Sequence, residues 1–528
     1  MPVALALPEQ RQSPPPDLEI RPKAFRAWVE ALPLAQTLDS ARKLAAYLAA
    51  LNACRVSPDV RAELVEACRT HAQVLLEELQ DVYVKSAQPL GPRGRDALAA
   101  ARALAGELAI AYQVAAADTA ARRLGFGLRK QQATLLVHAT QCLAAQVIAS
   151  FNAYSPVPAG AWKALHQIYL YAEQQEMVND PGEHPDGVTV AQAYCETLLL
   201  SLTDAYRLAP GELNRIVEQI RSLRAPVTLS RQKPATRPGG HFLVPCDTDR
   251  GPKPALSAND DTGGPNWRVF DANPIVDRLR TRKQALESGN VSATMMKALG
   301  DDATVLLGKL ITLWGDPPKR AYRRDPSDLT VAICVGLKAI AHFVTHDAKV
   351  DASTQELALK KGITMPMPAL VEDDEARMVP IYEWAVVNQS AGGLKVRRAQ
   401  GAMQPLAVGE VVGIRAPGKP HWTIAVVRWI TTLDDGGAEF GLQYVGSAVR
   451  AVWAQATISN SRQSKQALLV EDEDSPGAQL LAAPAGTYSE LREFDLNAEG
   501  YSARMRASGV IELTGRFDLF HLCASGPV

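Results

Sequence analysis

The hydrophobic pattern of this chain changes its period near residue 224, and this change limits how the chain can fold. From Lys23 to about Leu223 the sequence is rich in Ala, Leu, Glu, Gln and Arg with helical spacing. From Ala225 to about Pro274, apolar and β-branched residues come in short runs between Gly, Pro and Asp, and after two helical segments (275–287 and 292–314) such runs resume. A segment with helical periodicity and one with strand periodicity form different secondary structures. We therefore predict a multidomain protein, with an all-α N-terminal helical domain followed by a β-rich region.

Helical spacing is clearest in six segments of the first region, and with weaker ones these predict about seven or eight helices. The six segments are 38–52, 57–78, 96–117, 130–153, 189–206 and 210–223. No fixed period relates them, so an internal repeat is not indicated. Helical arrays of this size often bind other proteins, and we expect a protein partner here whose identity the sequence does not give.

A polar hexapeptide interrupts the β-rich region. The sequence Asn388-Gln-Ser-Ala-Gly-Gly393 follows Trp-Ala-Val-Val and precedes Leu-Lys-Val. This pattern predicts a strand, a tight polar turn and a second strand. The two glycines allow backbone or a ligand to approach the turn closely.

A basic run lies upstream of this turn. Lys319-Arg-Ala-Tyr-Arg-Arg324 places Arg320 and Arg324 four positions apart, and an apolar strand candidate follows at 329–335. Three more strand candidates, at 408–415, 423–431 and 438–445, lie downstream of the turn. Asp434-Asp-Gly-Gly437 is a hairpin signal between the last two.

Together these motifs resemble the two half-signatures of PilZ domains, which are small β-barrels that bind cyclic di-GMP. The family pattern is Arg-x-x-x-Arg before the barrel and Asp/Asn-x-Ser-x-x-Gly within it. Here the resemblance covers about residues 319–446 and includes the closing-strand sequences Trp-Thr-Ile-Ala-Val-Val-Arg-Trp and Phe-Gly-Leu-Gln-Tyr-Val-Gly. The resemblance implies a PilZ-like β-barrel and a cytoplasmic effector, with an output in motility, pili, adhesion or biofilm formation.

The resemblance also implies a ligand site made of Arg320, Arg324, Asn388, Ser390 and Gly393. An arginine fork pairs with phosphate oxygens or with guanine O6 and N7, and it can stack on a purine face. Asn388 would accept a hydrogen bond from guanine, and Ser390 would reach a base or phosphate oxygen. The ligand would then lie against the bare backbone of Gly392 and Gly393.

Two features depart from the family pattern. Arg324 and Asn388 are 64 positions apart, because a helix candidate and a polar loop intervene at 336–380. Such a loop is tolerated, because closure entropy rises by only ~0.6 kcal/mol per doubling of length. Asn388 stands where many members have Asp, and its neutral amide accepts guanine's paired donors less strongly, so we expect modest affinity.

The resulting domain prediction has five parts. It consists of a flexible Pro-rich tail (1–22), the helical domain (23–224), a small β segment with connecting helices (225–314), the PilZ-like barrel with its insertion (315–448) and a C-terminal β region (449–528). The last part is either an extension of the barrel or a separate small β-module. The helix candidate 292–314 is a potential lever between the ligand site and the rest of the chain.

Other classes of function find little support. Cationic and anionic side chains balance, 56 against 57, which argues against a nucleic-acid binder. No apolar run approaches the ~18 residues of a membrane-spanning helix, so we expect no membrane insertion. The seven cysteines lack paired spacing and are expected to be mostly buried thiols rather than ligands or disulfides. We expect no cofactor and no catalytic site.

Two alternatives remain open at this stage. In one, a PilZ-like barrel without a ligand serves as a scaffold, and the protein acts through protein–protein contacts. In the other, His342 and His346, four positions apart on a helix, hold a metal ion for hydrolysis. A solvated polar face that also includes Lys338 and Thr345 explains that spacing more simply.

Overall fold

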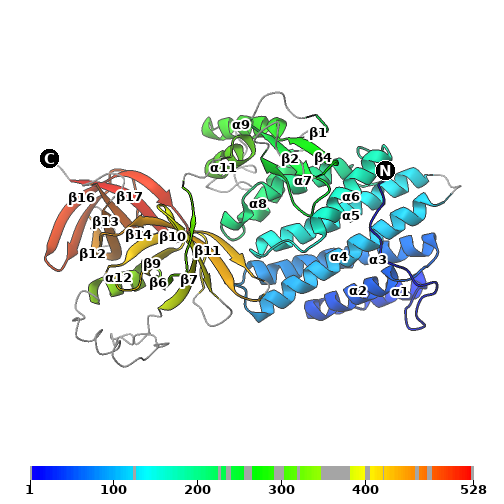
Figure 1. Ribbon diagram of the computed structural model, residues 1–528, viewed down its shortest axis with the longest axis horizontal. Helices are drawn as coiled ribbons and strands as arrows, with labels where there is room; N and C mark the ends of the chain where they lie inside the picture. Colours follow the sequence, from blue (N-terminus) through cyan, green and yellow to red (C-terminus); the bar gives the residue numbers. More distant parts are fainter. Residues whose placement is uncertain are drawn as a thin grey trace. The chain divides into compact units, whose positions relative to one another are not determined.

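The computed structural model describes thirteen stretches of the chain, which form two compact units (Figure 1). One unit is Met1–Ser86 with Leu90–Lys319, and the other is Arg320–Val528 with Ala87–Pro89. The described residues are 3–122, 127–223, 228–232, 239–254, 264–289, 303–317, 322–346, 381–398, 405–419, 421–433, 435–457, 463–471 and 478–524.

Eight α-helices within the described residues build most of the first unit. They are α1 (Pro22–Glu30), α2 (Thr37–Asn52), α3 (Pro58–Val84), α4 (Pro92–Ala120), α5 (Leu128–Asn152), α6 (Ala161–Gln174), α7 (Val190–Ser201) and α8 (Glu212–Leu223). The 3-10 turns Leu34–Gln36 and Ala205–Arg207 lie between them. Proline is the first residue of α1, α3 and α4, where its missing N–H has no helical partner to lose. The predicted all-α region is therefore confirmed, with α3 and α4 longer than the periodicity indicated.

Helix α5 is the most apolar long helix of the bundle. By length and composition it is the one helix among the described residues that could cross a membrane, but 61% of its apolar window is buried inside the unit. Leu136 and Val137 on this helix are fully buried with residues of the neighbouring helices. This is the environment of a core helix.

A small antiparallel sheet and two further helices complete the first unit. The sheet has the order β1-β4-β2-β3, and all the elements predicted as a β segment with connecting helices lie within this unit. Their bounds are β1 (Thr228–Ser230), β2 (His241–Pro245), β3 (Lys253–Pro254), β4 (Trp267–Asp271), α9 (Asn273–Glu287) and α11 (Ala303–Gly315). Residues 292–302 of the predicted lever lie outside the described part.

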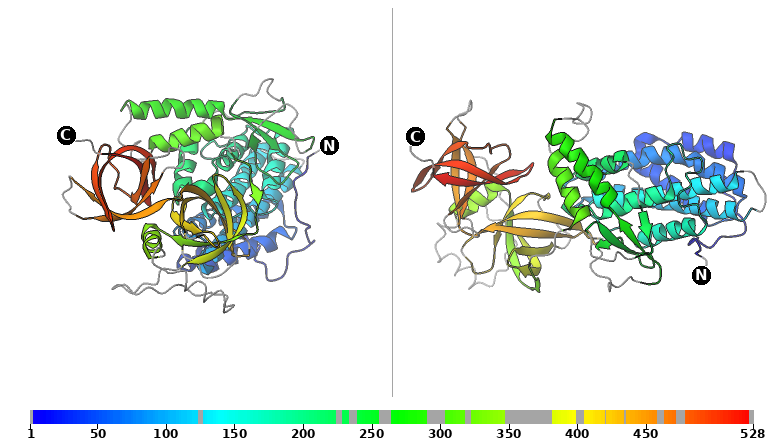
Figure 2. Two further views of the ribbon diagram at one scale, coloured as in Figure 1. Left: turned by 60° about the vertical axis from the view of Figure 1, so that its left-hand side comes forward. Right: turned by 90° about the horizontal axis from the view of Figure 1, so that it is seen from above.

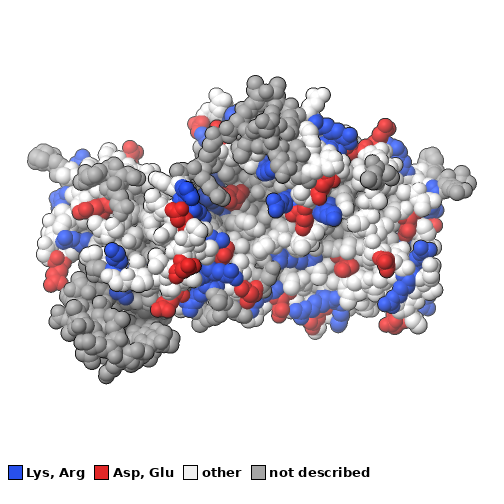
Figure 3. All heavy atoms as spheres, viewed as in Figure 1, with Lys and Arg blue, Asp and Glu red and all other residues white. Residues whose placement is uncertain are grey.

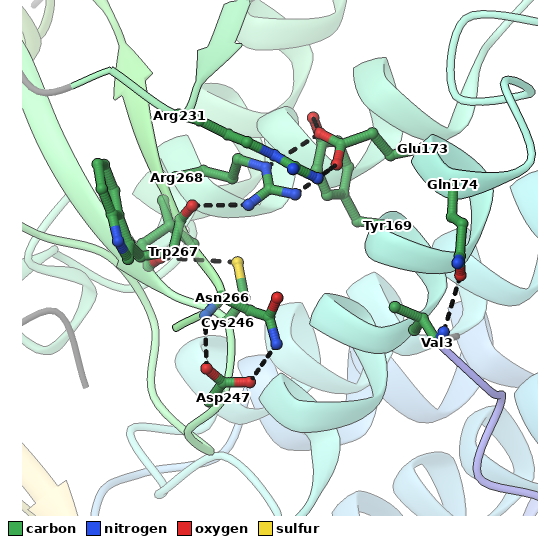
Figure 4. A network of polar contacts seen from close by, with 11 residues as sticks. Val3, Tyr169, Glu173, Gln174, Arg231, Cys246, Asp247, Asn266, Trp267 and Arg268 are labelled. Carbon is green, nitrogen blue, oxygen red and sulfur yellow. Dashed lines mark hydrogen bonds and ion pairs between the residues drawn. The ribbon is translucent and has the colours of Figure 1, made fainter. Parts of the chain in front are cut away.

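A buried ion pair ties this sheet to α6. Figure 4 shows Arg231 and Arg268 both directed at the carboxylate of Glu173. The Arg268 side chain is 2% exposed, its Nε donates to Glu173 Oε1 at 3.0 Å, and Nη1 donates to the Trp267 carbonyl at 2.7 Å. The guanidinium therefore depends on Glu173 for its charge compensation.

The N-terminal segment differs from the flexible tail that its proline content indicated. Backbone hydrogen bonds join Arg11 to Ala53 and Arg55 at 2.8 and 2.9 Å. The Val3 N–H donates to Gln174 Oε1 at 2.7 Å, as Figure 4 also shows. Proline removes donors only at its own positions, so the other residues still bond along the bundle.

The second unit contains the predicted β-barrel. Its strands are β6 (Thr330–Val335), β7 (Tyr382–Ser390), β8 (Gly393–Arg398), β9 (Val411–Arg415), β10 (Thr423–Thr432) and β11 (Ala438–Gly446), preceded by the two-residue strand β5 (Asp325–Pro326). All pairings are antiparallel, and β7–β8 closes the sheet into what we call the first barrel.

A second closed barrel follows directly, which decides the alternative left open for the C-terminal region. Its order is β12-β13-β14-β17-β16-β15, and Figure 2 shows it end-on. The strands are β12 (Val449–Ala456), β13 (Lys465–Glu471), β14 (Gln479–Pro484), β15 (Glu493–Ala498), β16 (Tyr501–Leu513) and β17 (Phe517–Ala524). The sequence predicts strands at 449–458, 466–470, 510–513 and 516–522, which correspond to β12, β13, β16 and β17, and does not indicate β14 or β15.

The two barrels have the same connectivity. In each, the first strand pairs with the second, the second with the third, the third with the sixth, the sixth with the fifth, the fifth with the fourth, and the fourth with the first. The C-terminal region is therefore a topological copy of the first barrel.

Helix α12 (Leu337–His346) lies in the core that joins the two barrels. Phe343 of this helix stacks on Trp422 of the first barrel, with ring centroids 5.4 Å apart. The shared core also contains Cys334, Ile340, Val411, Ile424, Val426, Leu468, Val470, Leu480, Ala482, Phe517 and Leu519. The outer face of β13, β14 and β17 is therefore covered, whereas the matching strands β7, β8 and β11 of the first barrel carry the candidate site.

Charges on the surface are mixed. On the face that Figure 3 shows, the described Lys and Arg side chains alternate with Asp and Glu rather than gathering by sign. This agrees with the near-equal totals of the two kinds of charge.

Candidate ligand-binding site

The Asn388–Gly393 hexapeptide is a hairpin with a shorter turn than we predicted. Asn388 and Ser390 belong to strand β7, and Gly393 begins β8, so only Ala391 and Gly392 form the turn. Ser390 and Gly393 are ladder partners, and the Ser390 hydroxyl donates to the Gly393 carbonyl at 3.3 Å. A two-residue loop matches the twist of paired strands, which explains why the ladder continues through residues that we assigned to the turn.

Glycine is required at position 393 by geometry. Its φ is +155°, and a Cβ there would lie 2.0 Å from the carbonyl oxygen of Leu442. The last glycine of the hexapeptide therefore lets β8 approach β11 closely.

The short strand β5 brings Arg324, the last residue of the basic run, to this hairpin. Asp325 pairs with Gln389 and Pro326 pairs with Asn388. Arg324 precedes Asp325 and Ser390 follows Gln389, so the same antiparallel register places Arg324 opposite Ser390. Although Arg324 and Asn388 are 64 positions apart in the sequence, the antiparallel pairing of β5 with β7 brings them together, and the insertion does not separate them. Arg324 is exposed, whereas Arg320 lies outside the described residues.

An aromatic ring covers the turn. A Cβ on Gly392 would lie 3.0 Å from two ring carbons of Tyr322, the residue two positions before Arg324. The Tyr322 side chain is itself 57% exposed. Nearby, Arg323 lies 3.6 Å from Asp325, and this pair is highly exposed. Such a pair in water is weak, so Arg323 is available to an anionic ligand.

One residue from each of four strands forms a row across the outer face of the barrel. Asn388 of β7 pairs with Lys395 of β8, Lys395 with Gly441 of β11, and Gly441 with Trp429 of β10. The indole of Trp429 covers Gly441, since a Cβ there would lie 1.8 Å from its Nε1. Lys395 Nζ is 5.9 Å from the Trp429 ring centroid and 2.7 Å from the carboxylate of Glu439.

Asn388 has an unused acceptor in this row. Its Oδ1 atom is buried and has no hydrogen-bond partner in the structure. A buried polar atom without a partner is costly, so such an atom marks a place where a ligand donor would be stabilising.

An arginine at the end of β8 has a structural role. Arg398, at the far end of β8, stacks over Tyr382 with its guanidinium carbon 4.5 Å from the ring centroid. Burial lowers the pKa of this guanidinium. It packs against the barrel, in contrast to the exposed arginines before β5.

The proposed metal pair receives no support from the described residues. His342 lies on α12, and the side chain of His346 is outside the description. Among the described residues, no group of three or more His, Cys, Asp or Glu side chains is arranged to hold a metal ion. All seven cysteines are free thiols, and five of them are buried, as we predicted.

Sequence reasoning assigned no role to five residues of the site, of which two adjoin the motifs and three lie on other strands: Tyr322, Lys395, Trp429, Glu439 and Gly441. Trp429 was within a quoted strand sequence, but simple alternation along β10 would place it on the same face as the buried Val427. Its place in the row was not visible, because a β-bulge between Val427 and Trp429 shifts the register.

Comparison with known proteins gives consistent matches. A family model described as the N-terminal domain of the cyclic-di-GMP receptor FimW matches residues 23–235. A second, described as the middle PilZ domain of the same receptor, matches residues 241–362 and 345–450. The cyclic-di-GMP receptor FimW of Pseudomonas aeruginosa is 24% identical to this chain, over all of it and 94% of the relative. The family-model matches end where the second barrel begins.

Proposed function

Because this chain is a PilZ-domain protein, we propose that it binds cyclic di-GMP on the outer face of its first barrel. The observation that carries this proposal is the β5–β7 ladder, which holds Arg324, the last residue of the basic run, alongside Asn388 and Ser390. Without this pairing the two half-motifs would be separate surface features. With it, cationic, hydrogen-bonding and glycine positions share one edge of the barrel.

Each part of the site suits a different part of the ligand. Arg320 and Arg324 would pair with the phosphates, because a guanidinium offers two parallel donors to phosphate oxygens. The unpartnered Oδ1 of Asn388 would accept a hydrogen bond from guanine. Ser390 would reach a base or phosphate oxygen, and Gly393 would keep the hairpin in place by allowing β8 to lie close to β11. A purine ring would stack on the indole of Trp429, which lies along the same row.

We further propose that the protein is a cytoplasmic receptor without catalytic activity, whose output passes to a protein partner of the helical domain. The receptor role of the relative and the shared domain order support this view. Ligand binding would order the basic segment, and only a difference in affinity between two arrangements can drive such a change. Retention of the partner by a chain lacking residues 23–223 would contradict this assignment.

Titration calorimetry with cyclic di-GMP tests the site directly. Each of Arg320→Ala and Arg324→Ala removes charge-assisted bonds worth ~1.5–3 kcal/mol, so the dissociation constant should rise by roughly 10- to 150-fold. Arg504→Ala is the matched control, because it removes an exposed arginine on the second barrel. Equal affinity of the wild type and both site variants would refute the site. No heat with the wild type would favour the scaffold alternative.

A further inference from the structure

A third arginine lies beside the candidate ligand turn. Arg428 is on β10, and its Nε donates to Oε1 of Gln443 on β11 at 2.7 Å. Gln443 is the ladder partner of Gly393, the last residue of the hexapeptide. Neighbouring strands are about 4.8 Å apart, so this hydrogen bond fixes the guanidinium close to the turn. Neither half-motif includes Arg428.

The second barrel engages this guanidinium. Arg428 Nη1 lies 2.5 Å from Oε1 of Glu512 on β16. The two side chains are 29% and 21% exposed, so their interaction is less screened by solvent than that of an exposed pair. A polar connection therefore runs from Gly393 through Gln443 and Arg428 to Glu512.

The part of β16 that carries Glu512 is held on one side only. The ladder between β15 and β16 ends at the Glu493–Arg506 pair, and Ala507 donates to the Arg492 carbonyl. Beyond it, residues 509–513 pair with β17 alone among the described strands, with register shifts after Ala507 and Val510.

The same end of the hairpin contacts the first barrel through side chains. The Thr514 hydroxyl donates to the Gly409 carbonyl at 3.3 Å, and Arg516 lies 3.8 Å from Glu410. A bulged, singly paired strand held by such contacts is a segment whose local stability a change at Arg428 can alter.

We propose that Arg428 is a ligand-binding arginine and that Glu512 occupies it until cyclic di-GMP takes its place. In the ligand-free chain one carboxylate binds the guanidinium. A ligand with two phosphates above the hairpin offers more negative charge and several acceptor oxygens to a guanidinium that Glu512 contacts through Nη1 alone, so it displaces Glu512. The end of the β16–β17 hairpin then loses one of its contacts with the first barrel. This inference rests on the proposed function, because it requires the ligand at that hairpin.

The sign of the effect follows from competition. Removing the competitor frees Arg428 in advance, so the ligand no longer has to break the ion pair before binding. By linkage, the same coupling that loosens the hairpin on binding raises the affinity when the hairpin contact is removed. A variant lacking the Glu512 charge should therefore bind the ligand more tightly than the wild type.

The test compares full-length Glu512→Gln with Asp495→Asn by titration calorimetry. The control removes another ion pair of the second barrel, Asp495–Arg504, which joins β15 to β16 and does not involve the first barrel. We expect Glu512→Gln to lower the dissociation constant about 5-fold or more, at the lower end of common coupling factors, and Asp495→Asn to leave it unchanged. Arg428→Gln, checked for an unchanged unfolding midpoint, should raise it at least tenfold.

Hydrogen exchange provides an independent readout. Cyclic di-GMP should speed exchange of the amides at 508–516 in the wild type and in the control. In Glu512→Gln these amides should exchange fast without ligand and change little with it. Wild-type binding with equal affinities for Glu512→Gln and Asp495→Asn, or with unchanged exchange at 508–516, overturns this inference alone. Absence of wild-type binding overturns both this inference and the proposed function.

Discussion

The ion pair between Arg268 and Glu173 allows a quantitative prediction for the first unit. Glu173→Gln removes the carboxylate that compensates a guanidinium whose side chain is 2% exposed. Breaking a buried pair by removing one partner costs ~3–5 kcal/mol. Because the Glu173 side chain is 25% exposed, water offsets part of this loss, and we take about 3 kcal/mol. A unit of this size shifts by about 2 °C per kcal/mol, so the unfolding midpoint should fall by roughly 6 °C.

Scanning calorimetry of the full chain measures this shift, and hydrogen exchange of peptides from α6 and β4 assigns the transition. Asp59→Asn is the control. It removes a pair with Arg122 whose side chains are 70% and 32% exposed, and such pairs contribute ~0–1 kcal/mol. If both variants shift the midpoint equally, Glu173 does not compensate a buried charge and the reasoning is wrong.

The pH dependence provides a second check on the same pair. Burial acts to raise the pKa of Glu173, but hydrogen bonds and charge from Arg268 and Arg231 outweigh it, and the net pKa lies below the usual 4.5. A carboxyl whose pKa is lower in the folded state stabilises that state above the unfolded pKa, and this stabilisation is lost as pH falls through the folded pKa. The difference between the wild type and Glu173→Gln should be constant near neutral pH and shrink below about pH 4.5.

Two predictions concern the ligand hairpin. Asn388→Asp should lower the dissociation constant for cyclic di-GMP by roughly 5-fold in titration calorimetry, because a charged acceptor adds ~1 kcal/mol and Lys395 lies opposite to offset its charge; weaker binding would show that burial of the carboxylate dominates. Gly393→Ala should lower the unfolding midpoint of the second unit and weaken binding of cyclic di-GMP, since strained backbone costs ~1–3 kcal/mol and the added Cβ meets the carbonyl of Leu442. Gly392→Ala should be milder, because its Cβ meets only the ring of Tyr322; equal losses in the two variants would contradict the geometric argument.

Much of the architecture was predictable because it depends on local patterns. The helices of the first unit follow from the period of their apolar residues, and α4 begins at Pro92, four residues before the periodic segment 96–117. The β7–β8 hairpin follows from the Ser-Ala-Gly-Gly sequence between apolar runs. These signals involve residues that are close together in the sequence, so they can be recognised without knowing the fold.

Part of the candidate site was also predictable from its motifs. Asn388, Ser390 and Gly393 lie on one hairpin, and Arg324 lies beside them. Trp429 and Lys395 were not predictable, because their neighbours come from other strands and a bulge sets the register. Register shifts depend on pairing energies along the whole ladder, which a single strand sequence does not contain.

The sequence by itself thus determined the change from helices to strands, the hairpin and the chemistry of the residues that could face a dinucleotide. Only the tertiary structure decided that β5 returns to β7 across 64 positions. It also decided that the C-terminal strands close into a second barrel with the connectivity of the first, and that Glu512 meets Arg428. Pairings between distant segments are selected by burial of shared apolar surface and by closure of open strand edges, which are properties of the whole fold.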